Sequence, residues 1–165
     1  MENTLIRHVT NADAPSIAGI YNHYVENTAI SYEESAVSAH EMAGRIGAVA
    51  AASLPWLVAE RDGQVVGYAY ATQWKARGAY RYSAECNVYL APGAVGTGLG
   101  SRLYAALFSE LRNRKLHVAM GCIALANAAS IALHEKMGMT QVAHFKEVGY
   151  KFGRWIDIGY WQCTL

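Results

Sequence analysis

The chain has 165 residues, 53% of them hydrophobic and 16% charged, so it can bury the core of one domain and is not expected to be disordered. The formal net charge is +1 and no Lys/Arg cluster is dense enough to neutralise many phosphates, which argues against nucleic acid as a partner. The longest nonpolar run, Val118 to Ala126, is too short to span a bilayer, which argues against a membrane protein.

The cysteines and histidines show no ligand spacing. Cys86, Cys122 and Cys163 lie far apart, and the six histidines are scattered. This pattern favours a reducing compartment and predicts no metal site. The N-terminus has no signal pattern and no linker interrupts the chain, so we expect a cytoplasmic protein with a single domain over residues 1–165. Cys86 and Cys122 are expected to be small buried residues and not nucleophiles.

The first half of the chain predicts one strand, then two helices, then two more strands. Asn11 or Asp13 can cap the first helix, and Ser38-Ala39-His40-Glu41 matches a capping box that opens the second. Pro55 ends that region, and Asp62-Gly63 is a hairpin turn. The predicted strands cover residues 5–9, 56–60 and 65–72, and the predicted helices cover residues 14–26 and 38–52.

The second half predicts a strand, a glycine-rich turn and a helix, followed by three strands and one more helix. In the first of these helices Leu99, Leu103, Ala106, Leu107 and Leu111 form the expected buried stripe. Gly138 is a suitable residue to end the last helix. The predicted strands cover residues 82–90, 117–123, 142–148 and 155–162, and the helices end near residues 114 and 137. The order β-α-α-β-β-β-α-β-α-β-β predicts an α/β (α+β) fold with a mixed sheet of about seven strands and helices on both faces.

The glycine-rich turn, residues 91–100, predicts a ligand that carries phosphate. Such a turn lets backbone N–H groups converge on an anion, and the helix behind it adds its positive dipole end. The dinucleotide fingerprint is not met, because Ser101 stands where its third glycine belongs and no acidic residue lies among residues 120–123. No Gly-Lys-Ser/Thr occurs for a P-loop, and the protein-kinase motifs are also absent.

The context of this turn resembles a known family. A strand, a Gly-x-Gly-x-Gly turn, a helix, a strand and then the segment Asn127 to Met139 are similar to the GNAT acetyltransferase superfamily. Four further segments are similar to its branch of phosphinothricin and methionine sulfoximine or sulfone N-acetyltransferases, and together they cover essentially the whole chain. These segments are residues 20–23, 84–89, 128–136 and 147–155.

The resemblance implies the GNAT fold and acetyl-CoA as the co-substrate. The turn would hold the pyrophosphate through backbone groups, the end of the preceding strand would pair with the pantetheine amides, and Asn127 would lie near the pantetheine arm as well as cap its helix. Val95 and Thr97 depart from the family, which usually has Arg or Gln in place of Val95 and often a basic residue in place of Thr97. The cofactor-binding set is Val88, Tyr89, Leu90, Gly96, Thr97, Gly98, Leu99, Gly100, Ser101 and Asn127.

Two residues are predicted to carry the chemistry. Strand alternation places Ser83, Glu85, Asn87 and Tyr89 on one polar face, with Glu85 just before the turn. The alternative for Glu85 is a solvent-facing or ion-paired glutamate, and the resemblance makes it the general base that deprotonates an amine. His134 stands where many family members have a tyrosine that protonates the leaving thiolate, and we assign it as an acid or a positioning residue.

The predicted substrate is a small amino-acid-like amine, acetylated directly in a ternary complex. The basic loop Lys75-Ala76-Arg77 leads into the Glu85 strand and suits an anionic or polar oxygen. Asn87 is predicted to help place the substrate. Tyr32 is a candidate pocket wall, although its alternative, a core position, is favoured. C-terminal aromatic residues suggest a homodimer. The alternatives are a non-catalytic acyl-CoA sensor, a nicotinamide oxidoreductase, or acetylation of another amine, such as an aminoglycoside or a peptide N-terminus.

Overall fold

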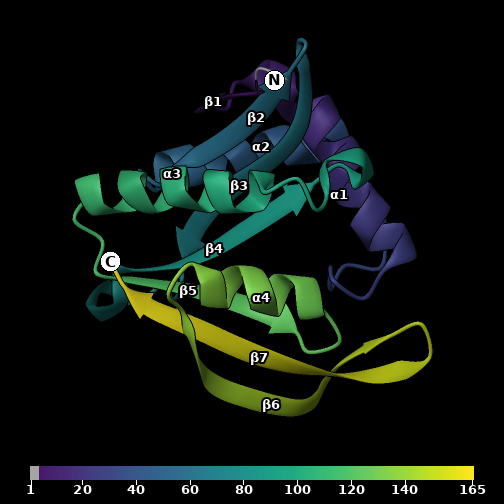
Figure 1. Ribbon diagram of the computed structural model, residues 1–165, viewed down its shortest axis with the longest axis vertical. Helices are drawn as coiled ribbons and strands as arrows, with labels where there is room; N and C mark the ends of the chain where they lie inside the picture. The colour runs from purple at the N-terminus through teal and green to yellow at the C-terminus, as the bar shows by residue number, and fades with distance from the viewer. Residues whose placement is uncertain (1–3) are drawn as a thin grey trace.

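A computed structural model describes residues 4–165, and its elements follow the predicted order (Figure 1). The described strands are β1 (Thr4–His8), β2 (Trp56–Arg61), β3 (Gln64–Gln73), β4 (Ser83–Leu90), β5 (Val118–Ala124), β6 (Thr140–Lys151) and β7 (Arg154–Thr164). The α-helices of the same residues are α1 (Ala14–Asn27), α2 (Ala39–Ala51), α3 (Leu99–Asn113) and α4 (Ala128–Lys136). None of these helices is long and apolar enough to cross a membrane.

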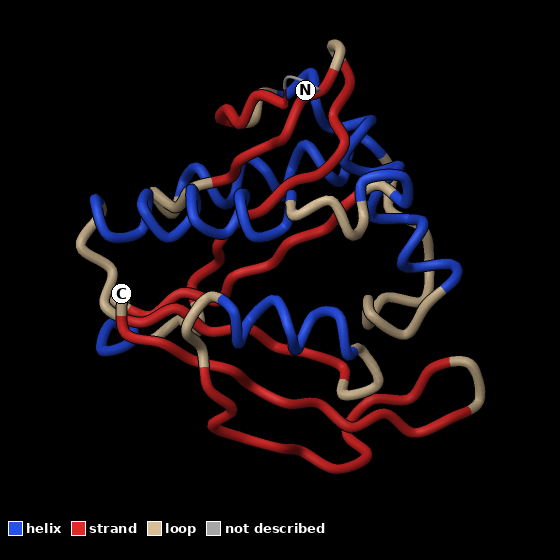
Figure 2. Tube along the Cα trace, viewed as in Figure 1, coloured by secondary structure: helices blue, strands red, loops and turns tan. Residues whose placement is uncertain are grey.

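The strands form one mixed sheet in the order β1-β2-β3-β4-β5-β7-β6. Helices α1 and α2 cover one face of the sheet, and α3 and α4 cover the other (Figures 1 and 2). The expected sheet of about seven strands with helices on both faces is therefore confirmed. The neighbours β4 and β5 are parallel, and every other neighbouring pair is antiparallel.

Local sequence signals explain where several elements begin. The Ser38 hydroxyl accepts a hydrogen bond from the Glu41 backbone N–H at 3.1 Å, which caps α2 and is one half of the predicted capping box. The Glu41 carboxylate accepts a hydrogen bond from Arg45. At the hairpin between β2 and β3, Asp62 and Gly63 have φ angles of 49° and 76°. These left-handed conformations match the twist of the flanking strands, which is why an Asp-Gly pair occupies the turn.

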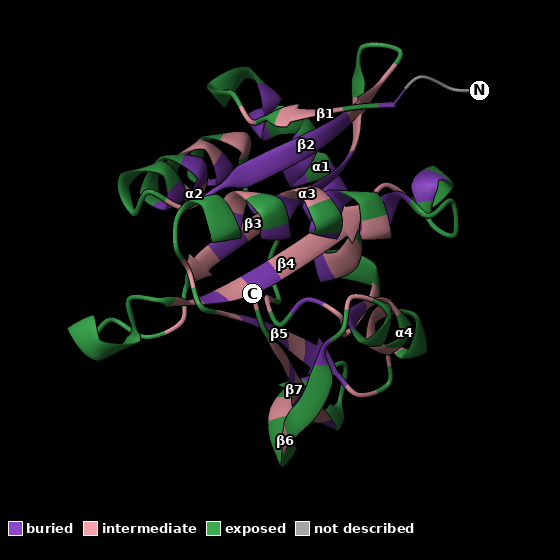
Figure 3. Cartoon of the chain, turned by 60° about the vertical axis from the view of Figure 1, so that its left-hand side comes forward, coloured by how far each residue is buried: buried purple, intermediate pink, exposed green. Residues whose placement is uncertain are grey.

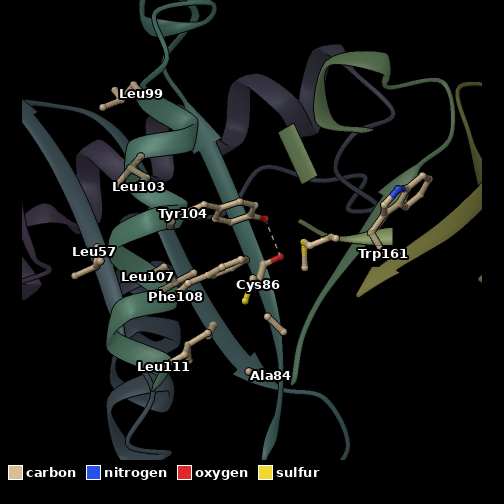
Figure 4. Close-up of a cluster of buried hydrophobic side chains, with 14 of the residues drawn as sticks. Leu57, Ala84, Cys86, Leu99, Leu103, Tyr104, Leu107, Phe108, Leu111 and Trp161 are labelled. Atoms are coloured by element: carbon tan, nitrogen blue, oxygen red, sulfur yellow. Dashed lines mark hydrogen bonds between the residues drawn. The ribbon is translucent and has the colours of Figure 1, made fainter. Parts of the chain in front are cut away.

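Each face of the sheet has its own hydrophobic core. Figure 4 shows part of the core beneath α3, where the helix presents Leu99, Leu103, Leu107 and Leu111 to the sheet. Tyr104 and Phe108 are also fully buried there, whereas Ala106, predicted to be part of the stripe, is only half-buried. The apolar stripe is thus wider than predicted because two aromatic residues extend it. The second core lies under α1 and α2.

The parallel pair β4 and β5 is joined only at its start. The paired residues are Ser83 with Val118, Ala84 with Ala119, and Glu85 with Met120. Beyond Glu85, β4 continues to pair with β3 as far as Leu90, but it has no strand on its other side within the described residues. Backbone groups on that open edge are consequently available to a ligand.

The C-terminal strands form one long hairpin, although the sequence predicts two shorter strands separated by about six residues. Strand β6 continues through an irregularity in which Glu147 has a φ of 52°, and Asp157 of β7 accepts a hydrogen bond from the Glu147 backbone N–H at 2.9 Å. Phe152 and Gly153, with φ angles of 52° and 73°, make the two-residue turn. Much of the hairpin is exposed (Figure 3).

A buried lysine fastens this hairpin to the end of α1 and the loop that follows it. The side chain of Lys151 at the end of β6 donates hydrogen bonds to the backbone oxygens of Val25, in the last turn of α1, and Ser31, at 2.7 and 2.8 Å. Lys151 is only 4% exposed, and burial lowers the pKa of its ammonium group. The contact holds the loop that follows α1, residues 28–38, against the hairpin.

We expect Lys151→Met to lower the free energy of unfolding by about 2–4 kcal/mol, because two buried carbonyl oxygens lose their donor. Chemical denaturation measures this change. Lys146→Met, at an exposed position on the same strand, is the control and should change stability by less than about 0.5 kcal/mol. Equal effects of the two substitutions would show that the buried bonds of Lys151 contribute little.

Candidate active site

The glycine-rich turn has the backbone shape that the sequence predicts. Gly96 and Gly98 have φ angles of 79° and 80°, and Gly98 is the residue directly before α3. Only glycine adopts this left-handed conformation without steric cost. The Thr97 hydroxyl donates to the Ala94 carbonyl at 2.7 Å, so it stabilises the turn from within. The N–H groups of the first turn of α3 have no partner within the helix, so they can bind an anion.

A cleft opens where β4 and β5 separate. It is lined by the predicted residues Asn87, Val88, Tyr89, Asn127 and His134, together with residues that were not predicted. Leu90 lies at the end of the same strand, and its carbonyl oxygen accepts a hydrogen bond from the Tyr24 hydroxyl. The fold therefore brings the predicted pantetheine-binding backbone, the predicted cap residue and the predicted acid to one cleft.

Asn127 has the capping role expected from its position. Its side-chain oxygen accepts a hydrogen bond from the Ser130 backbone N–H at 3.1 Å, at the start of α4. Ser130 in turn contributes its carbonyl oxygen to His134, one helical turn later. The same short helix thus positions both predicted residues beside the cleft.

The hydrogen bonds of His134 define which nitrogen carries its proton. The side chain is 3% exposed, and burial lowers the pKa of the imidazole, so the neutral form is favoured. Nδ1 lies 2.7 Å from the Ser130 carbonyl oxygen, which can only accept, so Nδ1 carries the hydrogen. Nε2 of the neutral ring is then an acceptor, and the Tyr104 hydroxyl lies 3.0 Å from it. This arrangement favours the positioning role among the two predicted for His134.

Tyr104 is a cleft residue that sequence reasoning missed. Its single hydroxyl hydrogen is shared between two acceptors, His134 Nε2 at 3.0 Å and the backbone oxygen of Cys86 at 3.2 Å (Figure 4). It therefore connects α3, His134 and the first β4 residue beyond the paired segment. Gly121 of β5 makes room for the His134 ring, because a Cβ atom at residue 121 would lie 2.3 Å from His134 Nε2. No sequence signal separates Tyr104 from an ordinary core aromatic, since it lies on the buried face of its helix.

Glu85 lies half-buried beside the cleft on the polar face of β4, as predicted. Burial raises the pKa of its carboxyl group, and the charge of Lys75 and a hydrogen bond with Tyr160 oppose that rise. A raised pKa brings a carboxylate base closer to the pH at which it must accept a proton. Tyr160 was predicted only as a C-terminal aromatic residue, and its place beside Glu85 depends on the pairing of β5 with β7.

Tyr32 and Cys122 stand near Glu85 and correct two expectations. Tyr32 is 44% exposed, so its alternative placement in the core is wrong. Its hydroxyl lies 3.7 Å from the Cys122 sulfur. Cys122 was expected to be buried but is only half-buried, because it lies at the edge where the cleft meets the sheet face that carries Glu85. Burial nevertheless raises the pKa of its thiol, which disfavours the nucleophilic thiolate.

Only part of the predicted substrate loop, residues 75–77, lies at the site. Lys75 lines a hollow of about 500 Å³ on the sheet face that carries Glu85, formed mainly by β5, β6 and β7 with Tyr160, Cys122 and Phe145 in its walls. Ala76 and Arg77 are exposed, and the structure does not place them in this hollow. Only the first residue of the loop thus lies next to the predicted base.

Comparisons with known proteins agree with this geometry. A family model described as "Acetyltransferase (GNAT) domain" matches residues 6–159. The chain is 43% identical to phosphinothricin N-acetyltransferase of Alcaligenes faecalis over 92% of its length and 78% of the relative. It is 38% identical to an L-methionine sulfoximine/L-methionine sulfone acetyltransferase of Salmonella typhimurium, over 97% of this chain and 94% of the relative.

A solved structure gives the same result for the fold. A putative acetyltransferase of Salmonella typhimurium, determined with its cofactor acetyl-CoA, superimposes with a TM-score of 0.96 at 38% sequence identity. The match covers 99% of this chain and 94% of the other.

We expect Gly98→Val to weaken acetyl-CoA binding roughly 10- to 100-fold, because a β-branched residue is strained at this positive φ and would displace the turn. Calorimetric titration measures the affinity. Gly93→Val is the matched control, since Gly93 lies in the same turn without a left-handed φ and has open space around its Cβ direction. Thr97→Ala should cost less than about threefold, because its hydroxyl bonds within the turn. If Gly93→Val or Thr97→Ala lost more affinity for acetyl-CoA than Gly98→Val, the backbone conformation at Gly98 would not be what binds the cofactor.

Proposed function

Because the chain belongs to the GNAT family of acetyltransferases, we propose that it transfers the acetyl group of acetyl-CoA to the α-amine of a small amino-acid-like substrate. Phosphinothricin, methionine sulfoximine and methionine sulfone are the substrate types, as the names of its relatives suggest. The observation that carries the proposal is the half-buried Glu85 beside an open strand edge and a glycine turn. This arrangement supplies a base and a backbone edge on β4 and an anion site in the turn that follows it.

The residues present fit acetyl-CoA. Its pyrophosphate suits the left-handed glycine turn and the N-terminus of α3, and its pantetheine amides suit the open edge of β4 after Glu85. Ser101, in the first turn of α3, extends the same anion site. Val95 and Thr97 carry no positive charge, so the backbone N–H groups of the turn would bind the pyrophosphate.

The proposed reaction is direct transfer in a ternary complex. The neutral amine forms a C–N bond with the thioester carbonyl carbon, the C–S bond breaks, and Glu85 accepts the proton that the amine loses. The departing thiolate requires a proton. We propose that the Tyr104 hydroxyl, which His134 Nε2 holds at the cleft, gives its proton to the thiolate and regains one from solvent through the cleft. We therefore assign His134 as the residue that positions Tyr104.

We also propose a homodimer and a cytoplasmic location. Six large apolar side chains of the β6–β7 hairpin are between 47% and 63% exposed: Val142, Phe145, Val148, Tyr150, Phe152 and Trp155. Such a patch is typical of a protein interface. The described cysteines are all free thiols, which supports a reducing compartment. Sedimentation analysis with Trp155→Glu tests the dimer, since a charge on this patch should shift the enzyme toward monomer.

Glu85→Gln is expected to lower kcat by roughly 100-fold or more at neutral pH, because a general base is lost. Wild-type activity should fall as the pH drops through the raised pKa of Glu85, since the protonated carboxyl cannot accept a proton. The variant should lack this acid limb and recover activity at high pH, where the amine deprotonates unaided. Glu135→Gln, at an exposed glutamate on α4, is the control. Thiol release from acetyl-CoA measures turnover. Near-native activity of Glu85→Gln would show that Glu85 is a structural residue and not the base. A non-catalytic sensor would show no turnover in any variant.

Lys75→Met should raise KM for sulfone or phosphinate amino acids about 10- to 100-fold, because a charge-assisted hydrogen bond to the substrate is lost. It should also move the acid limb to higher pH, because the charge of Lys75 lowers the pKa of Glu85. Arg77→Met is the matched comparison and should do less, since Arg77 lies outside the hollow. A rise in KM for acetyl-CoA alone would assign the loop to the cofactor.

A further inference from the structure

The loop after α1, residues 28–38, brings two side chains to the candidate site. Ile30 lines the cofactor cleft. The Tyr32 hydroxyl lies 3.7 Å from the sulfur of Cys122, which lines both the cleft and the hollow beside Lys75. The loop therefore forms part of the wall where acetyl-CoA and the acceptor amino acid of the proposed reaction would meet.

Ser31 stands between these two residues and anchors the loop. It is 1% exposed, and its hydroxyl donates to the Tyr21 hydroxyl of α1 at 2.9 Å. Its backbone oxygen accepts a hydrogen bond from the Lys151 ammonium group at 2.8 Å, and the same group donates to the Val25 oxygen at 2.7 Å. The centre of the loop is thus fixed to α1 on one side and to the C-terminal hairpin on the other (Figure 2).

The ammonium group of Lys151 does more than fill space. Burying a charged group is costly, and its two hydrogen bonds within residues 4–165 both go to neutral carbonyl oxygens. Glu33 and Glu34 of the loop act on it only through their charge. A methionine of similar length would fill the same space without that cost. A lysine here is therefore best explained by the need to hold the two carbonyl groups.

We propose that Lys151 is a positioning residue of the reaction. It holds the Ser31 carbonyl and thereby keeps Ile30 and Tyr32 at the cleft, so the acceptor amino acid meets a wall that is already in place. Lys151 itself touches neither ligand, because it acts from the end of β6 through the backbone of the loop. The inference rests on the proposed acetyltransferase function.

Thiol labelling measures the position of the loop without turnover. Each variant is treated briefly with iodoacetamide, and the modified cysteines are identified by mass spectrometry. Lys151→Met should raise the labelling rate of Cys122 about 10-fold, because Tyr32 no longer stays beside the sulfur. Cys86 is 2% exposed in the core and should stay unlabelled, which shows that the protein remains folded. Lys146→Met, at an exposed position of the same strand, should change neither rate.

A substitution that only destabilises the fold separates positioning from a structural role. Leu57→Ala leaves a cavity in the core beneath α3 and should lower stability about as much as Lys151→Met. It should leave the labelling of Cys122 unchanged. Lys151→Gln, whose amide can still donate to one carbonyl, should give an intermediate rate and serves as the test if Lys151→Met does not fold. Equal labelling of Cys122 in the Leu57 and Lys151 variants would overturn the inference.

Steady-state kinetics test the consequence for the acceptor. Lys151→Met should raise KM for methionine sulfone about 10-fold. It should change the affinity for acetyl-CoA less than about threefold, because the lysine bonds neither to the glycine turn nor to the edge of β4. In a Tyr32→Ala background, Lys151→Met should have little further effect on KM, because the wall that the lysine holds is already gone. Independent effects of the two substitutions would contradict the proposed route through the loop.

The results distinguish this inference from the proposed function. If wild-type enzyme acetylates methionine sulfone but Lys151→Met leaves its KM or the labelling of Cys122 unchanged, the inference is overturned and the acetyltransferase function stands. If the wild-type enzyme acetylates no amine, the proposed function fails, and the positioning role of Lys151 fails with it.

Discussion

The separation of β4 from β5 after Glu85 is the constraint on which the site depends. Buried backbone groups need hydrogen-bond partners, and a strand that loses its neighbour must find them elsewhere. At Cys86, the first residue beyond the last pair, the Tyr104 hydroxyl supplies that partner. Gly121 leaves the space that His134 fills on the opposite strand. The cleft is therefore kept open by side chains from α3 and α4, and the rest of the β4 edge is left for a ligand.

The core beneath α3 and the proposed base Glu85 lie on opposite faces of the sheet. Residues of β4 alternate, so Cys86 faces the core beneath α3, whereas Glu85 lies on the face covered by α1 and α2. Beyond β4 no helix of the described residues covers that second face, because α1 and α2 pack on β2, β3 and β4 (Figure 1). The loop after α1 and the C-terminal hairpin border it instead, and Lys151 joins them. A small substrate thus has access to Glu85 from the side opposite α3 and α4.

Much of this fold could be predicted from the sequence because its signals are local. The glycine turn, the Ser38 cap and the alternation around Glu85 each depend on a few neighbouring residues, and the element order followed from them. What could not be predicted depends on pairing between distant segments. Tyr104 looks like any core aromatic until α4 brings His134 to it, and Tyr160 gains its position only when β7 pairs with β5. Arg77 shows the converse, because proximity in sequence to Glu85 did not place it in the site.

The charges around Glu85 explain why an amino acid suits the site better than a polyamine. Burial keeps His134 neutral and raises the pKa of the Tyr104 hydroxyl, so neither adds charge at neutral pH. Glu85 is then the negative group nearest the cleft, and Lys75 is the cation that acts on it. In the reaction that we propose, a zwitterionic amino acid brings its amine to Glu85 and an anionic oxygen to Lys75, which satisfies both charges at once. A polycation could satisfy only Glu85 and would be repelled by Lys75, because both residues face the same side of the sheet.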